Sequence, residues 1–255
     1  MSDLTERSVT NDATEYGAPP RMQPLVAFRA LKKLIADPER TDEVFVIIRA
    51  LSGNSIGRGL KRFKRLPVGR RVLSQREVLL ETLLDRDGLE AIAAATPSET
   101  LADAYLRFTR EGNITADGLV DASEQEGKER FESADHKLYG ERLRDAHDLW
   151  HTLVGYGRDE LGEVCLLAFT YAQTRNRGIG VMGFVGMFKL AEYYGRGVYS
   201  AVWRAYRDGK RADWLPGQDW QALLGLPIED VRARLGIVAP AQYTQLRMLD
   251  EAVPA

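Results

Sequence analysis

The chain has 255 residues, of which 44% are hydrophobic, and this is enough apolar surface for one domain with a sizeable core. The formal net charge of −2 provides no overall attraction to polyanions, so we expect no nucleic-acid partner. The single cysteine, Cys165, excludes an internal disulfide and is typical of a protein from a reducing compartment. No apolar run reaches the roughly 18 residues that a membrane-spanning helix needs.

Residues 1–20 are polar, which predicts a disordered N-terminal tail. Their acidic residues outnumber Arg7, and they contain neither an Arg-rich transit peptide nor the apolar core of a secretory signal. We therefore expect a cytoplasmic bacterial protein. The basic run 58–71 and the apolar segment 178–190, described below, lead us to expect that it lies peripherally at the inner face of the cell membrane. We expect residues 21–239 to form one helical metal-binding domain and residues 240–255 to form a C-terminal tail.

Beyond Pro24, apolar residues recur every three or four positions, which is the spacing of helices that bury one face. Thr96-Pro97-Ser98-Glu99 has the residue order of a helix N-terminus, and it predicts a helix that begins there. Alternating strand patterns are absent. The sequence therefore predicts an all-α fold, a single-domain helical bundle with a metal-binding helical hairpin. The buried stripe of the helix after residue 96 is predicted to be Leu101, Ala104, Tyr105 and Phe108.

The strongest chemical signal is a pair of histidines, His147 and His151, four residues apart. A helix turns by about 100° per residue, so the two imidazoles share one face and can converge on one point. Asp148 can reach the same point from the side, and Glu163 can reach it from the next segment. Two nitrogens and two carboxylate oxygens are typical ligands of zinc, and iron or manganese is the alternative.

The first ligand helix is predicted to run from about residue 141 to residue 154, and a second helix is predicted from about residue 159. Cys165 follows Glu163 by two positions, so on a helix it faces another way and is predicted to be a core residue. His136 stands alone near Asp135 and Tyr139. We expect it to have a structural role, because a lone histidine is more often structural than a ligand.

The pattern His147-Asp148-x-x-His151, then eleven residues, then Glu163, resembles the signature of the coenzyme Q (ubiquinone) biosynthesis family called Coq-four. The metal motif is the specific part of the resemblance, which extends from about residue 25 to residue 237. Its other parts are the run Ala201 to Lys210, the tryptophans Trp214 and Trp220, and the run Val231 to Ile237.

The resemblance implies that the two histidines, Asp148 and Glu163 bind zinc or another divalent metal. It also implies a role in building the ubiquinone head group on a polyprenylated hydroxybenzoate ring, with oxidative or non-oxidative loss of the ring carboxyl at the membrane surface. Arg144, about one turn before the ligands, is predicted to be a catalytic residue that clamps the substrate carboxylate through its bidentate fork. The alternative for Arg144 is a surface ion pair.

A second reading is a non-catalytic, lipid-binding scaffold that organises ubiquinone-biosynthesis enzymes, because zinc sites closed by four protein ligands are usually structural. A zincin-type protease is disfavoured, because its general base is a Glu where this chain has the shorter Asp148. A phosphohydrolase of the His-Asp type needs further histidine ligands, and only His136 remains for that role.

A glycine-rich apolar segment follows the predicted ligand helices, from Gly178 to Leu190. Its glycines recur every third residue and would leave a smooth stripe on a helix. Such a stripe permits either tight helix packing or a groove for a polyprenyl tail. The residues predicted to bind lipid are Gly180, Met182, Gly183, Phe184, Gly186, Met187 and Phe188.

Seven basic residues and no acidic residue lie between Arg58 and Arg71. They are predicted to form either a solvated helix face or a contact with anionic lipid head groups. The expected partners are therefore a polyprenylated quinone precursor, other ubiquinone-biosynthesis proteins and an anionic membrane surface, and a homodimer is left open.

Overall fold

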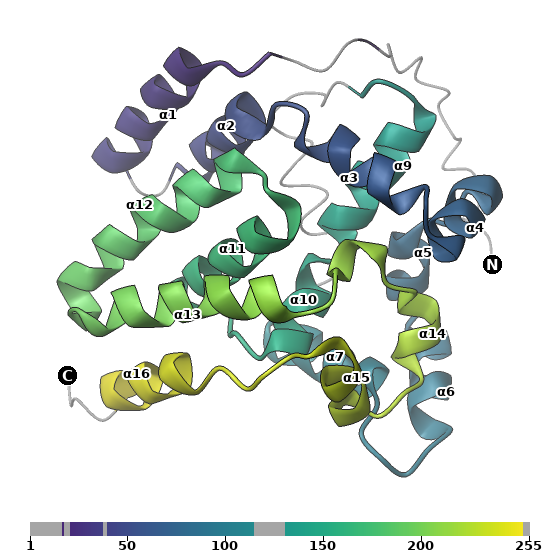
Figure 1. The fold of residues 1–255 in the computed structure, drawn as a ribbon. Helices are drawn as coiled ribbons and strands as arrows, with labels where there is room; N and C mark the ends of the chain where they lie inside the picture. The colour runs from purple at the N-terminus through teal and green to yellow at the C-terminus, as the bar shows by residue number, and fades with distance from the viewer. Residues whose placement is uncertain (1–16, 18–20, 38–39, 115–130, 252–255) are drawn as a thin grey trace, which may run out of the picture.

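The computed structural model describes residues 17, 21–37, 40–114 and 131–251. These residues form helices and no strand, so the all-α prediction is confirmed (Figure 1). An isolated antiparallel bridge joins Thr100 and Pro227. The helices are α1 (Pro24–Ala36), α2 (Thr41–Ser52), α3 (Ser55–Phe63), α4 (Pro67–Gln75), α5 (Leu79–Leu84), α6 (Arg86–Ala94), α7 (Leu101–Glu111), α9 (Ala134–Asp145), α10 (His147–Val154), α11 (Glu160–Thr174), α12 (Arg177–Tyr194), α13 (Gly197–Arg211), the 3-10 turn η1 (Leu215–Gly217), α14 (Trp220–Leu224), α15 (Ile228–Leu235) and α16 (Ala241–Glu251).

Buried apolar side chains form three clusters. The largest joins α5, α6 and α7 to α10, α11, α13, α14 and α15. A second cluster joins α3, α4 and α9, and a third joins α1, α2 and α12. In Figure 1, α10 lies near the middle of the molecule, with α1, α2 and α12 to one side of it and α4 and α5 to the other. The predicted ligand helix therefore sits in the main core.

The prediction of one continuous ligand helix is wrong, because the chain divides at Ala146 into α9 and α10. Asp145, the last residue of α9, has a buried carboxylate that accepts hydrogen bonds from Arg144 and from the backbone of Leu80 in α5. The contact with α5 is long-range, so helical spacing alone could not show it. The break makes His147 the first residue of α10.

The predicted helix start at residues 96–99 is also displaced. The helix α7 begins at Leu101, and Thr100 is its N-cap, in a reciprocal capping box with Asp103. Leu101 donates its N–H to the carbonyl of Leu226, so a contact from a distant loop holds the start of α7. Of the predicted stripe, three residues are buried and Phe108 is partly buried.

The segment designated as the C-terminal tail contains α16, which packs against α13 and α11. Tyr243 of this helix is 9% exposed, and Leu246 lies over Gly197, where α13 begins. Apart from Gly17, the predicted N-terminal tail lies outside the described residues, as do residues 115–130 and 252–255.

Cys165, predicted to be a core residue, and His136, predicted to be structural, both lie in the interior. Cys165 is fully buried in the main cluster, and burial raises the pKa of its thiol to about 12. His136 is buried beside Phe131, and its Nδ1 accepts a hydrogen bond from the backbone N–H of Glu132 at 3.3 Å. Desolvation lowers the pKa of His136, so its neutral form is favoured.

Candidate metal centre

Three of the four predicted ligands converge. His147 and His151 of α10 and Glu163 of α11 each offer a ligand atom, and these atoms lie within 4.8 Å of one another. The Nε2 atom of His151 is 3.3 Å from Oε1 of Glu163, and the Nε2 atom of His147 is 3.9 Å from Oε2. The imidazole centroids are 4.7 Å apart. This group could hold a metal ion.

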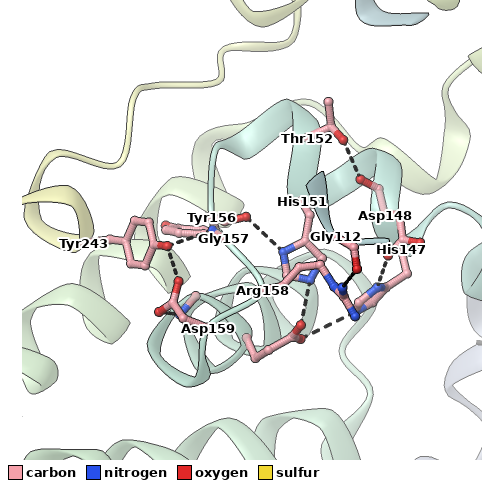
Figure 2. A network of polar contacts seen from close by, with 12 residues as sticks. Gly112, His147, Asp148, His151, Thr152, Tyr156, Gly157, Arg158, Asp159 and Tyr243 are labelled. Carbon is pink, nitrogen blue, oxygen red and sulfur yellow. Dashed lines mark hydrogen bonds and ion pairs between the residues drawn. The ribbon is translucent and has the colours of Figure 1, made fainter. Parts of the chain in front are cut away.

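His151 is held with its Nε2 atom directed to the centre. Its Nδ1 donates to the carbonyl of Tyr156 at 3.0 Å (Figure 2), so in the neutral ring Nε2 carries the lone pair. That Nε2 atom is buried and has no hydrogen bond within the described part of the chain. A buried nitrogen acceptor without a hydrogen bond costs free energy, and coordination to a metal would remove this cost. Phe108 stacks on the ring at 5.5 Å.

Asp148 lies at the back of His147, where its Oδ1 is 3.1 Å from Nδ1 of that ring. A carboxylate in this place accepts the Nδ1 proton and leaves Nε2 free, which is the usual way in which a second group orients a metal-binding histidine. Asp148 is not part of the converging group found among the described residues. Its role as a direct ligand remains a prediction.

The turn between the ligand helices depends on glycines. Gly155 ends α10 with a φ of 78°, which a residue with a side chain rarely adopts. A Cβ atom on Gly162 would lie 2.1 Å from the carbonyl oxygen of Gly157, so only glycine lets the turn cross the first turn of α11 this closely. Asp159 caps α11 by accepting from the N–H of Gly162 at 3.0 Å. The two glycines and the Asp159 cap together let the chain reverse direction, so that Glu163 on α11 lies next to α10.

The centre is open on one side. The His151 side chain is 0% exposed, whereas His147 is 35% exposed and Glu163 is 40% exposed. Two histidines and one glutamate with an open position form the ligand pattern of catalytic zinc sites, whereas structural sites are closed. The geometry therefore favours a site that a substrate can reach.

Arg144 lies in the last turn of α9 and is already paired. Its Nε and Nη2 atoms each donate to Oδ1 of Asp145 at 3.1 Å. Burial raises the pKa of Asp145, and Arg144 opposes this shift. The structure thus shows an ion pair, but one whose Asp145 side chain is 1% exposed and not the surface pair that was the alternative. The carboxylate clamp stays a prediction.

The glycine stripe of α12 faces α11. Gly183 is buried, and α11 and α12 pack along their lengths. A Cβ atom on Gly180 would lie 2.8 Å from a ring atom of Tyr171, and one on Gly186 would lie 2.5 Å from Val164. This face is therefore used for tight helix packing and is not an open groove.

Of the residues of α12 predicted to bind lipid, the two that point outward are Phe184, which is 60% exposed, and Phe188, which is 48% exposed. Met182 is buried against α1 and α2, and Met187 is partly buried against the main core. A lipid-binding role for this segment remains a prediction, and the outward face is the part that is free to have it.

The basic run from Arg58 to Arg71 is partly neutralised. Lys64 forms an ion pair with Asp135 at 2.7 Å, and Arg71 pairs with Glu77 and Asp219. The run lies on α3 and α4, and α4 is on the opposite side of the molecule from α12 in Figure 1. The part of the basic run on α4 therefore does not share one surface with α12.

Sequence reasoning missed two groups at this centre. One is the backbone carbonyl of Tyr156, which no residue pattern can identify. The other is Tyr243, which hydrogen-bonds to the turn between the ligand helices. Tyr243 belongs to residues 240–255, which were predicted only to be a C-terminal tail.

The fold and the centre define a class: an all-α protein in which a helical hairpin brings together two histidines and a glutamate that could hold a metal ion. Comparison with known families then identifies it. Residues 21–241 match the family of "Coenzyme Q (ubiquinone) biosynthesis protein Coq4", and the chain belongs to that family.

The chain is similar to "Ubiquinone biosynthesis protein COQ4, mitochondrial" of Podospora anserina, with 29% identity over 71% of this chain. It is 25% identical to the COQ4 homolog of Rattus norvegicus over 89% of this chain and 82% of that protein. The chain spans 57–59% of the length of three fungal relatives. A crystal structure of a Nostoc punctiforme PCC 73102 protein, titled as one of ubiquinone biosynthesis, has a TM-score of 0.61 at 21% identity over 85% of this chain and 99% of that one, which supports the fold alone.

These relatives correct one prediction. They are named as mitochondrial proteins, so the expectation of a cytoplasmic protein at the inner face of a bacterial membrane is wrong. That expectation relied on the composition of residues 1–20, which lie outside the region that matches the family. Among the described helices, none is both long and apolar enough to cross a membrane.

Proposed function

We propose that this protein is a metal-dependent carboxy-lyase that removes the ring carboxyl from a polyprenylated hydroxybenzoate. The observation that supports the proposal most directly is the convergence of the buried His151 with the partly exposed His147 and Glu163. Membership of a ubiquinone biosynthesis family supports a substrate from that pathway. Zinc suits two nitrogens and one carboxylate, and another divalent metal is the alternative.

A divalent ion held by these three side chains would act as a Lewis acid for negative charge on a substrate oxygen. The buried His151, fixed by the carbonyl of Tyr156, forms the rigid side of the centre. Asp148 holds the proton on Nδ1 of His147 and so keeps that ring in one orientation. His147 and Glu163 border the open side, where the ring and its carboxylate can enter.

The reaction balances without an oxidant when the ring carbon keeps the electron pair of the broken C–C bond and takes up a proton as carbon dioxide leaves. An oxidative version needs an external electron acceptor. The test follows carbon dioxide release from a carboxyl-labelled polyprenyl hydroxybenzoate, with and without an added quinone. We expect release by metal-loaded protein and a loss of at least about 100-fold after chelation, because Lewis-acid stabilisation contributes several kcal/mol. Equal release by chelated protein, or no release in either condition, would contradict the enzyme.

A second candidate, a lipid-contacting scaffold, is favoured by one surface. The rings of Phe184 and Phe188 on α12 are 4.9 Å apart, and Phe188 is 5.6 Å from Tyr199 on α13. Trp203, one turn further along α13, is 61% exposed. We call these four residues the outer aromatic surface. Exposed contiguous aromatic groups are typical of membrane or partner contacts, and Lys189 provides an adjacent positive charge.

We expect Phe188→Ser to reduce flotation of the protein with anionic liposomes by more than half, because it removes an exposed ring that would otherwise enter the interface. Leu84→Ser is the matched control, since Leu84 is 45% exposed and lies on α5, away from α12. Flotation measured at low and high salt separates apolar from electrostatic attraction. Equal flotation of both variants would exclude the outer aromatic surface as the contact.

A further inference from the structure

The C-terminal helix reaches the turn between the two ligand helices through one hydroxyl. The Tyr243 hydroxyl of α16 accepts a hydrogen bond from the N–H of Gly157 at 2.9 Å and donates one to Oδ2 of Asp159 at 2.5 Å (Figure 2). These contacts join residues separated by 86 and 84 positions in the chain. They link α16 directly to the turn between α10 and α11.

The two partners of Tyr243 hold different halves of the centre. Gly157 follows Tyr156, whose carbonyl orients the imidazole of His151. Asp159 is the N-cap of α11, the helix that carries Glu163 in its first turn. The Tyr243 hydroxyl therefore contacts both halves of the centre. Through Gly157 it holds the turn whose Tyr156 carbonyl orients His151, and through Asp159 it holds the start of the helix that carries Glu163.

The hydroxyl is itself held firmly. Tyr243 is 9% exposed, and its ring meets that of Tyr156 edge-on at 5.5 Å. Burial and the adjacent Asp159 raise the pKa of the Tyr243 hydroxyl, so it remains a proton donor at neutral pH. Arg247, one turn along α16, lies 3.5 Å from Oδ2 of Asp159 and adds a charged contact at the same place.

We propose that Tyr243 is a positioning residue of the metal centre, and that docking of α16 sets the distance between His151 and Glu163. The inference rests on the proposed metal site. It adds that a residue of α16, which supplies no ligand, influences the geometry of that site. Outer groups that orient metal ligands typically change affinity by about 10–100-fold when they are removed. Because Tyr243 acts through the turn, we expect the lower end of that range.

The test compares Tyr243→Phe with Tyr139→Phe. The first change removes the hydroxyl and keeps the ring contact with Tyr156. The second removes the hydroxyl of another buried tyrosine, whose ring packs against Phe63 at 5.2 Å. Zinc affinity is measured by competition with a chelator, and the visible spectrum of cobalt-loaded protein reports coordination geometry. We expect about tenfold weaker zinc binding and an altered cobalt spectrum for Tyr243→Phe alone.

A metal-free measurement separates this inference from the metal site. Hydrogen exchange of residues 155–163 in chelated protein should be faster in Tyr243→Phe than in wild type or Tyr139→Phe. Unchanged exchange overturns the inference whatever the metal result. If wild-type protein binds zinc and Tyr243→Phe binds it equally with the same spectrum, the coupling is wrong although the metal site stands. If wild-type protein binds no metal, the proposed function fails, and faster exchange still establishes that Tyr243 holds the turn.

Discussion

Replacing His151 by alanine will remove stoichiometric metal from the protein. His151 supplies the one fully buried nitrogen of the centre, and the two ligands that remain, His147 and Glu163, are both partly exposed. Loss of one ligand from three should weaken divalent-metal binding by at least about 100-fold, which corresponds to ~3 kcal/mol. Metal analysis after dialysis at a fixed free zinc concentration measures the effect.

The matched control for this prediction is His136→Ala, which removes the other buried histidine; among the described residues, His136 is in no group of converging ligand atoms. Both variants lose a buried ring and should be destabilised by about 1–3 kcal/mol, so the unfolding midpoint separates folding from metal loss. We expect His136→Ala to keep full occupancy. Full zinc occupancy in a folded His151→Ala protein would refute the assignment of the centre.

The second large effect concerns the start of α12. A Cβ atom on Gly178 would lie 2.4 Å from Cα and 2.5 Å from the carbonyl oxygen of Ile48 in α2. Both are backbone atoms, so relief requires two helices to separate. We expect Gly178→Ala to lower the free energy of unfolding by about 3 kcal/mol, at the upper end of typical overpacking costs. The thermal midpoint should fall by about 6–12 °C.

Gly183→Ala is the matched control on the same helix. A Cβ atom there would meet Leu167 at 3.4 Å, which is an ordinary contact. Alanine is also favoured over glycine within a helix by about 1 kcal/mol, so this variant should be neutral or slightly more stable. Urea unfolding of both proteins provides the comparison. Equal stabilities would show that α2 and α12 do not approach as closely as the structure places them.

Residue spacing along the chain was sufficient to predict which side chains meet at the candidate metal centre. Two histidines four apart on a helix must share a face, and a short turn must return the next helix to them, so His147, His151 and Glu163 could be predicted together. The orientation of each ring could not. It depends on a backbone carbonyl for His151 and on a choice of side-chain rotamer that turns Asp148 toward Nδ1 of His147.

The amino-acid sequence by itself determined the helical class, the hairpin that brings His147, His151 and Glu163 together, and the family, because periodicity and ligand spacing are local properties of the chain. Two local patterns were each compatible with two structures, and only the tertiary structure decided between them. The glycine stripe of α12 was compatible with a groove or with packing, and the arrival of α11 against it selected packing. The segment after residue 240 was compatible with a tail, and it forms α16 because Tyr243 and Leu246 find partners far away in the sequence. Such contacts depend on how distant elements meet in space, and spacing along one segment carries no information about them.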